Sequence, residues 1–294
     1  MELTERFDQN RSHLQGVAYR MLGSVGEAEE ALQEAWLRVR QEDPEAIRSM
    51  QAWLTTVVAR VCLNRLRSRR ARREVLTDFH VPDPLVSLPE VAGPEYEALL
   101  GESVGLGLLV VLDTLSPAER VAFVLHDVFG VPFADIATIL DRSRSAAMQL
   151  ASRARRRISG SPEPERDRAR QREVVDAFFA AAHGGDFEAL IDVLAPEVEL
   201  RIDGGVLRSD ASIILHGTEA VARHTANYSQ LYPHLRPALV NGAAGVIVAP
   251  GGRLFAVMGF TVANGQITRI DSLLDPERLA MVDTTGLRAG DEQA

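Results

Sequence analysis

The sequence predicts a multidomain protein with two all-α domains, one of them a helix-turn-helix, followed by a C-terminal α+β domain. Two short predicted helices joined by a three-residue turn occupy residues 131–158. Four prolines interrupt residues 81–94. From residue 235 onward the apolar pattern is typical of strands, and Asn264-Gly265 is a strong hairpin signal. A chain of 294 residues is long enough for two or three compact units.

Composition limits the class of protein. The chain has one cysteine, Cys62, which excludes an internal disulfide and favours a reducing cytoplasm. The first residues are polar and acidic, unlike a signal peptide. The longest apolar run, residues 104–112, is too short to span a bilayer. We therefore expect a cytoplasmic protein that does not interact with membranes.

The charge distribution predicts contact with nucleic acid, although the net charge is −9. Residues 60–73 contain 7 arginines and no acidic residue, and residues 142–160 contain 6 arginines and no acidic residue. Two concentrated basic blocks on an acidic background indicate two phosphate-facing surfaces. The chain has no lysine, so every basic contact comes from guanidinium groups, which suit bidentate binding of phosphate and guanine.

The first seventy residues predict three helices. The second begins at the capping-box spacing of Ser24 and Glu27 and runs to about Arg40. Its exposed flank is either a solvated face or a docking surface for a basic partner, and it consists of Glu29, Glu30, Gln33 and Glu34. The third helix continues from an apolar stripe into the first arginine block. Its candidate DNA contacts are Arg60, Arg65, Arg67 and Arg69.

Residues 131–158 predict the helix-turn-helix. Pro132 suits a first turn, an apolar stripe follows to Leu140, and Ser143 can cap the second helix. In such motifs the second helix enters the major groove. The face predicted to read bases comprises Arg144, Ser145, Met148, Gln149, Ser152 and Arg153, with Arg155, Arg156 and Arg157 on the backbone. An ordinary helical hairpin with a solvated arginine face is the alternative, and DNA binding is the better interpretation.

Flanking segments complete the helical part. The prolines make residues 81–94 an extended linker, because proline blocks helices and limits strands. The following residues 95–112 have a helical pattern. Ser116-Pro117-Ala118-Glu119 then has the spacing of a second capping box, which begins the helix leading into the helix-turn-helix.

The C-terminal region predicts helices followed by a strand meander, the order of an α+β cone. A first helix ends at His183-Gly184-Gly185, and Asp186 can cap a second helix that Pro196 stops. A strand over 198–202 and a helix over 218–232 follow. The predicted remaining strands lie at 235–240, 245–249, 253–263 and 266–271.

Catalysis is the weaker hypothesis for this cone. Proton abstraction could use a carboxylate with an imidazole or phenol, from a set comprising Asp203, Asp271, His216, His224, His234, Tyr228 and Tyr232. Their spacing specifies no geometry. The sequence has no phosphate-binding glycine loop, zinc-ligand cluster or nucleophile elbow. We therefore expect no enzyme, no cofactor and no metal.

The helical part resembles extracytoplasmic-function (ECF) sigma factors. The resemblance covers about residues 5–160 and rests on several motifs in the family's order. They are residues 18–24 (AYRMLGS), 28–38 (AEEALQEAWLR), 52–60 (AWLTTVVAR) and 150–156 (LASRARR). The resemblance implies a σ2 domain at 1–75, a linker at 76–104 and a σ4 domain at 105–160. The σ2 domain would bind RNA polymerase and the −10 element, and the σ4 domain would read the −35 element.

Individual roles follow from the same resemblance. The acidic flank matches the helix that docks on the clamp coiled coil of the polymerase. Residues 42–50 match the loop that captures a flipped base of the −10 element, which needs stacking and polar contacts to offset the unstacking. This loop contains no aromatic residue, so we expect few promoter mismatches to be tolerated.

The C-terminal region, residues 168–285, resembles the SnoaL-like branch of NTF2-like domains, which implies the SigJ-type subgroup of ECF sigma factors. The subgroup's three signatures correspond here to residues 80–84, 203–207 and 275–279. The resemblance implies an interdomain interface at these places. Its expected members are Pro82, Asp83, Pro84, Asp203, Gly204, Gly205, Asp275 and Pro276.

The sequence thus predicts an ECF sigma factor that its own C-terminal domain regulates in cis. The acidic cone could mask the arginine blocks or hold σ2 and σ4 at one spacing, and an independent domain on a tether is the alternative. Two other functions stay open: a helix-turn-helix regulator that senses a small ligand in the cone without joining polymerase, and an NTF2-like enzyme tethered to DNA.

Overall fold

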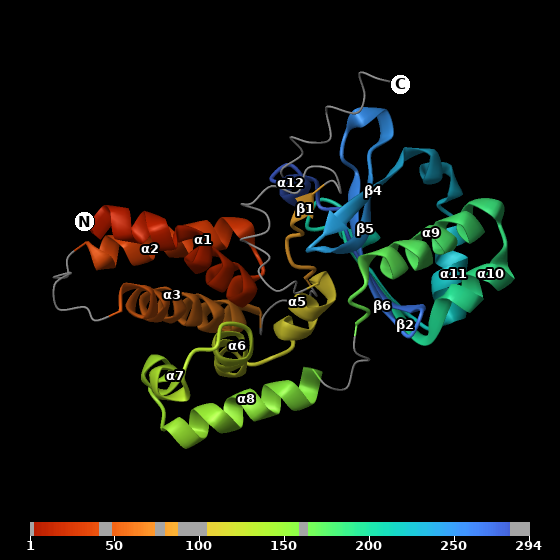
Figure 1. Cartoon of the computed structure of the whole chain (residues 1–294). Helices are drawn as coiled ribbons and strands as arrows, with labels where there is room; N and C mark the ends of the chain where they lie inside the picture. Colours follow the sequence, from red (N-terminus) through yellow and green to blue (C-terminus); the bar gives the residue numbers. More distant parts are fainter. Residues whose placement is uncertain (1–2, 41–48, 74–79, 88–104, 159–163, 283–294) are drawn as a thin grey trace. The chain divides into compact units, whose positions relative to one another are not determined.

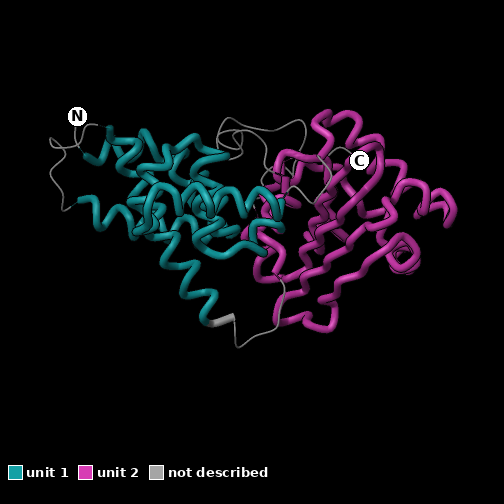
Figure 2. Tube along the Cα trace, turned by 90° about the horizontal axis from the view of Figure 1, so that it is seen from below, with its two compact units in different colours: residues 1–78, 97–102, 111–160 teal, residues 79–96, 103–110, 161–294 magenta. Residues whose placement is uncertain are grey.

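The computed structural model describes residues 3–40, 49–73, 80–87, 105–158 and 164–282. The chain divides into two compact units (Figure 2). Unit 1 comprises residues 1–78, 97–102 and 111–160, and unit 2 comprises residues 79–96, 103–110 and 161–294. Most of the loop predicted to capture a base, the linker beyond Ser87 and the predicted helical turns before Gly105 lie outside the described residues.

Three helices form the N-terminal half of unit 1: α1 (Leu3–Leu22), α2 (Val25–Val39) and α3 (Met50–Arg73) (Figure 1). Gly23 ends α1 with φ +71°, a left-handed conformation that favours glycine. The Ser24 hydroxyl then caps α2 by accepting a hydrogen bond from the Glu27 amide at 3.3 Å. The Glu27 carboxylate does not complete the predicted capping box, because it forms an ion pair with Arg69 of α3.

The second half of unit 1 is the predicted helix-turn-helix and the helices before it. These elements are the end of α5 (Leu106–Asp113), which belongs to unit 1 only from residue 111, followed by α6 (Pro117–Phe123), the π-helix η2 (Val124–Val128), α7 (Phe133–Leu140) and α8 (Arg144–Ile158). The capping box at Ser116 is complete, since serine and Glu119 each bond the other's backbone amide. Asp141 turns the chain between α7 and α8 with φ 53°, and the Ser143 hydroxyl accepts from the Ala146 amide at 3.2 Å. The cap predicted at Ser143 is therefore confirmed.

Buried arginines join the two halves of unit 1. Arg120 of α6 has 2% of its surface exposed, forms an ion pair with Asp113, and donates to the backbone carbonyl of Arg20 at 3.4 Å. Arg20 of α1 lies 5.2 Å from the centre of the Phe129 ring, which follows η2. Because unpaired buried charge is strongly unfavourable, these contacts fix how α1 and α6 pack.

Unit 2 is an α+β domain, as predicted. Its helices are α9 (Arg168–Gly184), α10 (Phe187–Val193), α11 (Thr218–Ala226) and α12 (Pro276–Leu279). Its strands are β1 (Val86–Ser87), β2 (Leu194–Asp203), β3 (Ile213–His216), β4 (Leu235–Val240), β5 (Ala243–Val248), β6 (Ala256–Ala263) and β7 (Gln266–Leu273). In the described part they form one sheet of order β1-β4-β5-β6-β7-β2-β3, in which only β2 and β7 pair in parallel.

The core of unit 2 lies between the sheet and helices α9, α10 and α11, which cover one of its faces (Figure 1). Three phenylalanine rings meet there edge to face, since Phe178 lies 5.2 Å from Phe179 and 5.9 Å from Phe260. At the hairpin between β6 and β7, Asn264 and Gly265 both have positive φ, 53° and 77°. This is the turn that the Asn-Gly signal predicts.

Several boundaries differ from those expected. Strand β2 begins at Leu194, before Pro196, and its register against β7 shifts between Leu194 and Glu199, so the proline occupies an irregular part of the ladder. Strand β3 was not predicted. The helix predicted over 218–232 ends at Ala226, and a 3-10 helix over Ser229–His234 that contains Pro233 replaces its second half.

Asp271 of β7 is the one carboxyl in the described sheet with 1% of its surface exposed. It lies opposite Gly259 of β6 and Arg201 of β2, on the face where Leu106 of α5 covers Gly259. Burial raises its pKa to about 7, although Arg269 and Arg201 oppose the shift. The folded protein therefore keeps this carboxyl protonated over a range in which an unfolded chain ionises it.

We expect this proton to make unit 2 less stable as the pH rises. Between about pH 4 and about pH 7 the unfolded state holds fewer protons, so stability falls by at most about 1.4 kcal/mol per pH unit and is constant above that window. Asp271→Asn removes this slope. Thermal unfolding of the full chain at pH 5 and pH 8 should show that the stability of the variant relative to wild type is higher at pH 8 than at pH 5. The exposed control Asp210→Asn should follow wild type, and an unchanged slope in Asp271→Asn would contradict the assignment.

Candidate nucleic-acid interface and protein-binding surfaces

Helix α8 presents the predicted recognition face to solvent. Ala147, Leu150, Ala151 and Ala154 are buried against the rest of unit 1. The opposite face is exposed at Arg144, Ser145, Met148, Gln149 and Arg153, with Ser152 half-buried. Met148 has 48% of its surface exposed, which is high for a large apolar side chain and favours contact with a partner.

Ion pairs divide the arginines of α8 into two groups. Arg153 and Arg157 reach the Glu119 carboxylate at 3.3 and 3.2 Å, and Arg155 reaches Asp127 at 2.7 Å. Burial of Glu119 opposes its ionisation, but hydrogen bonds from Ser116 and the two arginines outweigh burial and lower its pKa. Arg144 and Arg156 are exposed and have no ion pair within the described residues. These two keep their full hydrogen-bonding capacity for a ligand.

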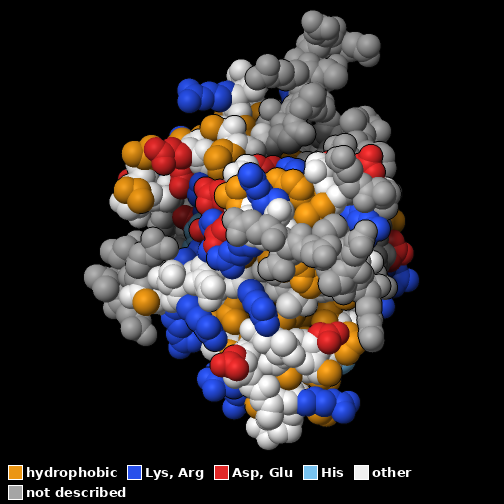
Figure 3. All heavy atoms as spheres, turned by 90° about the vertical axis from the view of Figure 1, so that its left-hand side faces the viewer, with side chains coloured by type: hydrophobic (Ala, Val, Ile, Leu, Met, Phe, Trp, Pro, Cys, Tyr) orange, Lys and Arg blue, Asp and Glu red, His pale blue; other side chains and the backbone are white. Residues whose placement is uncertain are grey.

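The arginines of α3 divide in the same way. Arg67 and Arg70 are exposed and form no ion pair in the described part of the chain, whereas Arg60 donates to the Thr138 carbonyl of α7 at 3.3 Å. Arg65 and Arg69 face α2 and its carboxylates. Basic side chains are spread over the lower part of the surface drawn in Figure 3, among hydrophobic and uncharged ones, at the height where α7 and α8 lie in Figure 1.

The acidic flank of α2 is exposed at Glu29, Glu30 and Gln33, and Glu34 is half-buried. Arg38 and Arg65 both reach Glu34, at 2.6 and 3.3 Å. Sequence reasoning missed Leu37, which has 55% of its surface exposed on the same side of the helix, four residues after Gln33. An exposed leucine beside carboxylates is typical of a protein interface. The sequence could have indicated this role, because Leu37 lies outside the apolar stripe that predicts the buried side of α2.

A third site joins the linker to the sheet within unit 2. The Arg278 guanidinium of α12 binds Asp83 of the linker at 2.5 Å and Asp203 of β2 at 2.8 Å. It also donates to the Val81 carbonyl, and the Val81 amide donates to the Asp203 carboxylate at 2.9 Å. Asp83 and Asp203 have 8% and 5% of their surfaces exposed. The site is thus a half-buried guanidinium between two buried carboxylates.

The remaining expected members of this interface lie around the same guanidinium. Pro82 and Pro84 are buried, and Asp275 caps α12 ahead of Pro276 by accepting from the Glu277 and Arg278 amides. Gly205 has φ +64°, and a Cβ there would lie 2.1 Å from an Asp275 carboxylate oxygen. The Gly204 amide donates to Ser212 at 3.0 Å. Glycines are therefore needed where this turn meets Asp275.

Three further residues of the linker site were absent from the expected set. One is His80, whose Nδ1 lies 3.3 Å from Arg278 Nη1 and 3.5 Å from Asp203 Oδ2. The others are Arg278 itself and Asn241, whose side-chain oxygen accepts from the Leu85 amide at 3.1 Å. Arg278 was recognisable as the basic member of residues 275–279. Asn241 gave no signal, because β1 is a two-residue strand whose pairing to Val240 and Leu239 of β4 a proline-rich sequence does not reveal.

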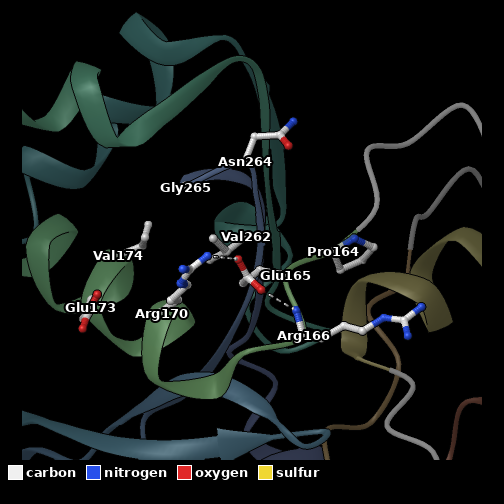
Figure 4. A pocket seen from close by; sticks show the side chains of 9 residues that line it. All are labelled: Pro164, Glu165, Arg166, Arg170, Glu173, Val174, Val262, Asn264 and Gly265. Carbon is white, nitrogen blue, oxygen red and sulfur yellow. Dashed lines mark hydrogen bonds and ion pairs between the residues drawn. The ribbon is translucent and has the colours of Figure 1, made fainter.

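Among the candidate catalytic residues of the cone, the rings of His224 and Tyr228 lie 4.9 Å apart, and the three residues described next have other partners or positions. Asp203 binds the linker, Asp271 is buried beneath α5, and the Tyr232 hydroxyl donates to the Thr225 carbonyl at 3.2 Å. A hollow of about 680 Å³ lies at the start of α9, outside the aromatic core (Figure 4). There the Glu165 carboxylate accepts hydrogen bonds from the Arg166 and Asp167 backbone amides, so the acidic group of this hollow already has backbone partners. We assign no ligand to this hollow.

No helix in the described ranges is long and apolar enough to cross a membrane.

Residues 6–72 match the family Sigma-70 region 2, and residues 106–158 match Sigma-70, region 4. The two helical halves of unit 1 are therefore the paired modules of a sigma-70-type initiation factor.

Full-length relatives specify the family. The chain is 38% identical over 297 residues to the ECF RNA polymerase sigma factor SigJ of Mycobacterium tuberculosis, covering 95% of this chain and 93% of that one. The probable ECF sigma factor SigI of the same organism is 35% identical, with 92% of each chain covered. The crystal structure of SigJ covers 96% of this chain and 99% of its own, with a TM-score of 0.78 and 34% identity. The chain belongs to the ECF RNA polymerase sigma factors.

Proposed function

We propose that this protein directs RNA polymerase to specific promoters, with α8 reading the −35 element and α2 docking on the polymerase clamp coiled coil. The observation that carries the proposal is the exposed polar face of α8 on a buried alanine and leucine stripe. Arg144 and Gln149 present the bidentate groups that recognise guanine and adenine. Arg156 at the far end suits a phosphate contact, which positions the helix without reading sequence.

The N-terminal bundle supports the other two contacts. The arginines of α3 that face solvent without an ion pair in the described ranges, Arg67 and Arg70, suit the backbone of the −10 region. Glu29, Glu30, Gln33 and Glu34 form an acidic surface with an exposed leucine beside it, which suits a basic partner.

We also propose that unit 2 regulates transcription in cis through the linker. Residues 81–87 connect the proposed −10 and −35 readers, and Arg278, Asp203 and Asn241 bind that segment. Holding the linker limits how far the two readers can separate. The net charge of −8 over residues 173–294 would add electrostatic masking of the two arginine blocks, which carry +7 and +6.

The docking surface predicts a defect from one charge reversal. Glu29→Arg places a cation on the acidic flank without touching the ion pairs of Glu30 and Glu34, and like charges across an interface cost several kcal/mol. We expect loss of co-elution with core polymerase and loss of run-off transcription. Glu188→Arg, at an exposed acid of α10, is the matched control. Normal co-elution of the Glu29 variant would exclude this surface.

The recognition face predicts two kinds of variant. Arg144→Ala or Gln149→Ala should cost about 1–3 kcal/mol at one base pair and relax the preferred −35 sequence. Arg156→Ala should weaken all sequences alike and reduce the salt dependence of binding by about one phosphate contact. Binding of holoenzyme to a −35 library measures both. An unaltered preference in the first two variants would mean that another face reads the promoter.

The linker site predicts the sign of regulation. Arg278→Leu leaves Asp83 and Asp203 buried without their cation, which costs about 3 kcal/mol or more and releases the linker. We expect faster hydrogen exchange at the Val81 and Leu85 amides and higher run-off transcription, as for a chain ending at Asp275. A chain ending at Gly160 also lacks β4, whose pairing still holds Val86 and Ser87 in the Arg278 variant, so it loses the spacing constraint altogether and should transcribe less. Arg253→Leu, at an exposed position, is the control. Equal output from all chains at matched holoenzyme concentration would refute regulation in cis.

A further inference from the structure

Arg65 of α3 connects the two binding surfaces of the N-terminal bundle. Its Nη1 lies 2.8 Å from Glu30 Oε2, and its Nη2 lies 3.3 Å from Glu34 Oε2. Arg65 belongs to the arginine block assigned to DNA, whereas both carboxylates belong to the flank assigned to polymerase. One ion-pair cluster therefore serves two surfaces with different partners.

The same geometry makes Arg65 unavailable to phosphate in the free protein. Both Nη groups point at carboxylates, and these are the groups that form a bidentate fork on a phosphate. Partial burial opposes the charged form of Arg65, but the hydrogen bonds to Glu30 and Glu34 outweigh it and raise its pKa. Arg67, two residues on, is exposed without such a pair in the described part of α2 and α3.

Arg69 is held differently and serves as a fixed contact. It binds Glu27 and donates to the Leu22 carbonyl at 2.9 Å, which ties the turn between α1 and α2 to α3. Its side chain has 18% of its surface exposed, against 28% for Arg65. The Glu30 side chain has 65% of its surface exposed, so a partner that approaches α2 can reach this carboxylate, which binds Arg65, directly.

We propose that Arg65 couples polymerase docking to DNA binding by exchanging its partner. Basic groups of polymerase that take Glu30 and Glu34 displace Arg65, and its guanidinium then contacts a phosphate of promoter DNA. The proposal rests on the proposed function of α2 and α3. Exposed ion pairs are individually weak, about 0–1 kcal/mol, so a charged partner can displace them. The free protein would thus bind DNA with one phosphate contact fewer than the holoenzyme.

The first test uses the full chain without polymerase, binding a short duplex by fluorescence anisotropy at 50–200 mM salt. Glu30→Gln with Glu34→Gln releases Arg65 and should steepen the salt dependence by about 0.9, an additional factor of about 3.5 in affinity across that range. Glu5→Gln with Asp8→Asn removes the same charge from exposed positions of α1. This control pair should raise affinity without steepening the slope.

The same two substitutions are then made in a chain that carries Arg65→Ala. This chain separates the contribution of Arg65 from general electrostatics and from Arg38, which also binds Glu34 and is released with it. There the Glu30 and Glu34 substitutions should no longer steepen the slope. A slope that steepens equally in the control pair, or that still steepens without Arg65, would overturn the proposal. Failure of docking itself is read separately, from co-elution of the Glu29→Arg variant with core polymerase.

A second measurement needs only Arg65→Ala, in case the carboxamide pair does not fold. Without polymerase, the salt slope of this variant should equal that of wild type, although the loss of one positive charge lowers its overall affinity for the duplex. In holoenzyme, its salt slope on promoter DNA should be smaller by about 0.9. A reduced slope in the free protein would mean that Arg65 already contacts DNA. An unchanged slope in both states would mean that it never does, and either result would overturn the proposal.

Discussion

The guanidinium of Arg278 fixes the linker, and most of the arrangement of unit 2 around β1 depends on it. Asp83 and Asp203 come from distant parts of the chain, and neither carboxylate could be buried without a shared cation. Once they are joined, Val81 and Leu85 find backbone and side-chain partners, and Val86 pairs with Val240 as an edge strand. A proline-rich segment that would otherwise be an extended connector is thereby part of a folded sheet. Under the proposed function, a change at α12, after the last strand, would therefore affect the segment between the two promoter-reading modules.

Packing inside unit 1 sets a second constraint on function. A compact unit of about 130 residues has a radius of gyration of about 14 Å. Under the proposed function, the two halves would contact elements named −35 and −10, that is about 25 base pairs apart, or about 85 Å of duplex at about 3.4 Å per base pair. The two helical halves cannot contact both elements while Arg120 lies buried between Asp113 and the Arg20 carbonyl. Under the proposed function, the contact of Arg20 with Phe129 and the buried pair of Arg120 must therefore open, and a held linker opposes that opening.

Local chemistry made the fold predictable, and long-range pairing limited what could be predicted of the sites. Three predicted features depend only on residues close together in the sequence, and the structure has all three. They are the apolar stripe ending at Leu140, the cap at Ser143 and the turn at Asn264-Gly265. The exposed face of α8 follows from the same period. The partner of an arginine does not, because Arg65 meets Glu34 only through the packing of α3 on α2, 31 residues apart in the chain. Strand β3 depends likewise on its antiparallel pairing with β2, and the register shift around Pro196 on the parallel pairing of β2 with β7.

The chain has no lysine, so the ion pairs between arginines and carboxylates determine which basic groups are free to bind a ligand. An arginine that offers both Nη groups to carboxylates has lost its fork for phosphate, whereas a lysine could share its ammonium among several acceptors. Internal acids therefore decide which arginines of a basic block can act on DNA. Arg67, Arg70, Arg144 and Arg156 are exposed and have no ion pair within the described residues, while Arg153, Arg155 and Arg157 are held by Glu119 and Asp127. Under the proposed function, carboxylates compete with phosphate for these arginines, and the salt dependence of DNA binding would measure how many of them contact phosphate.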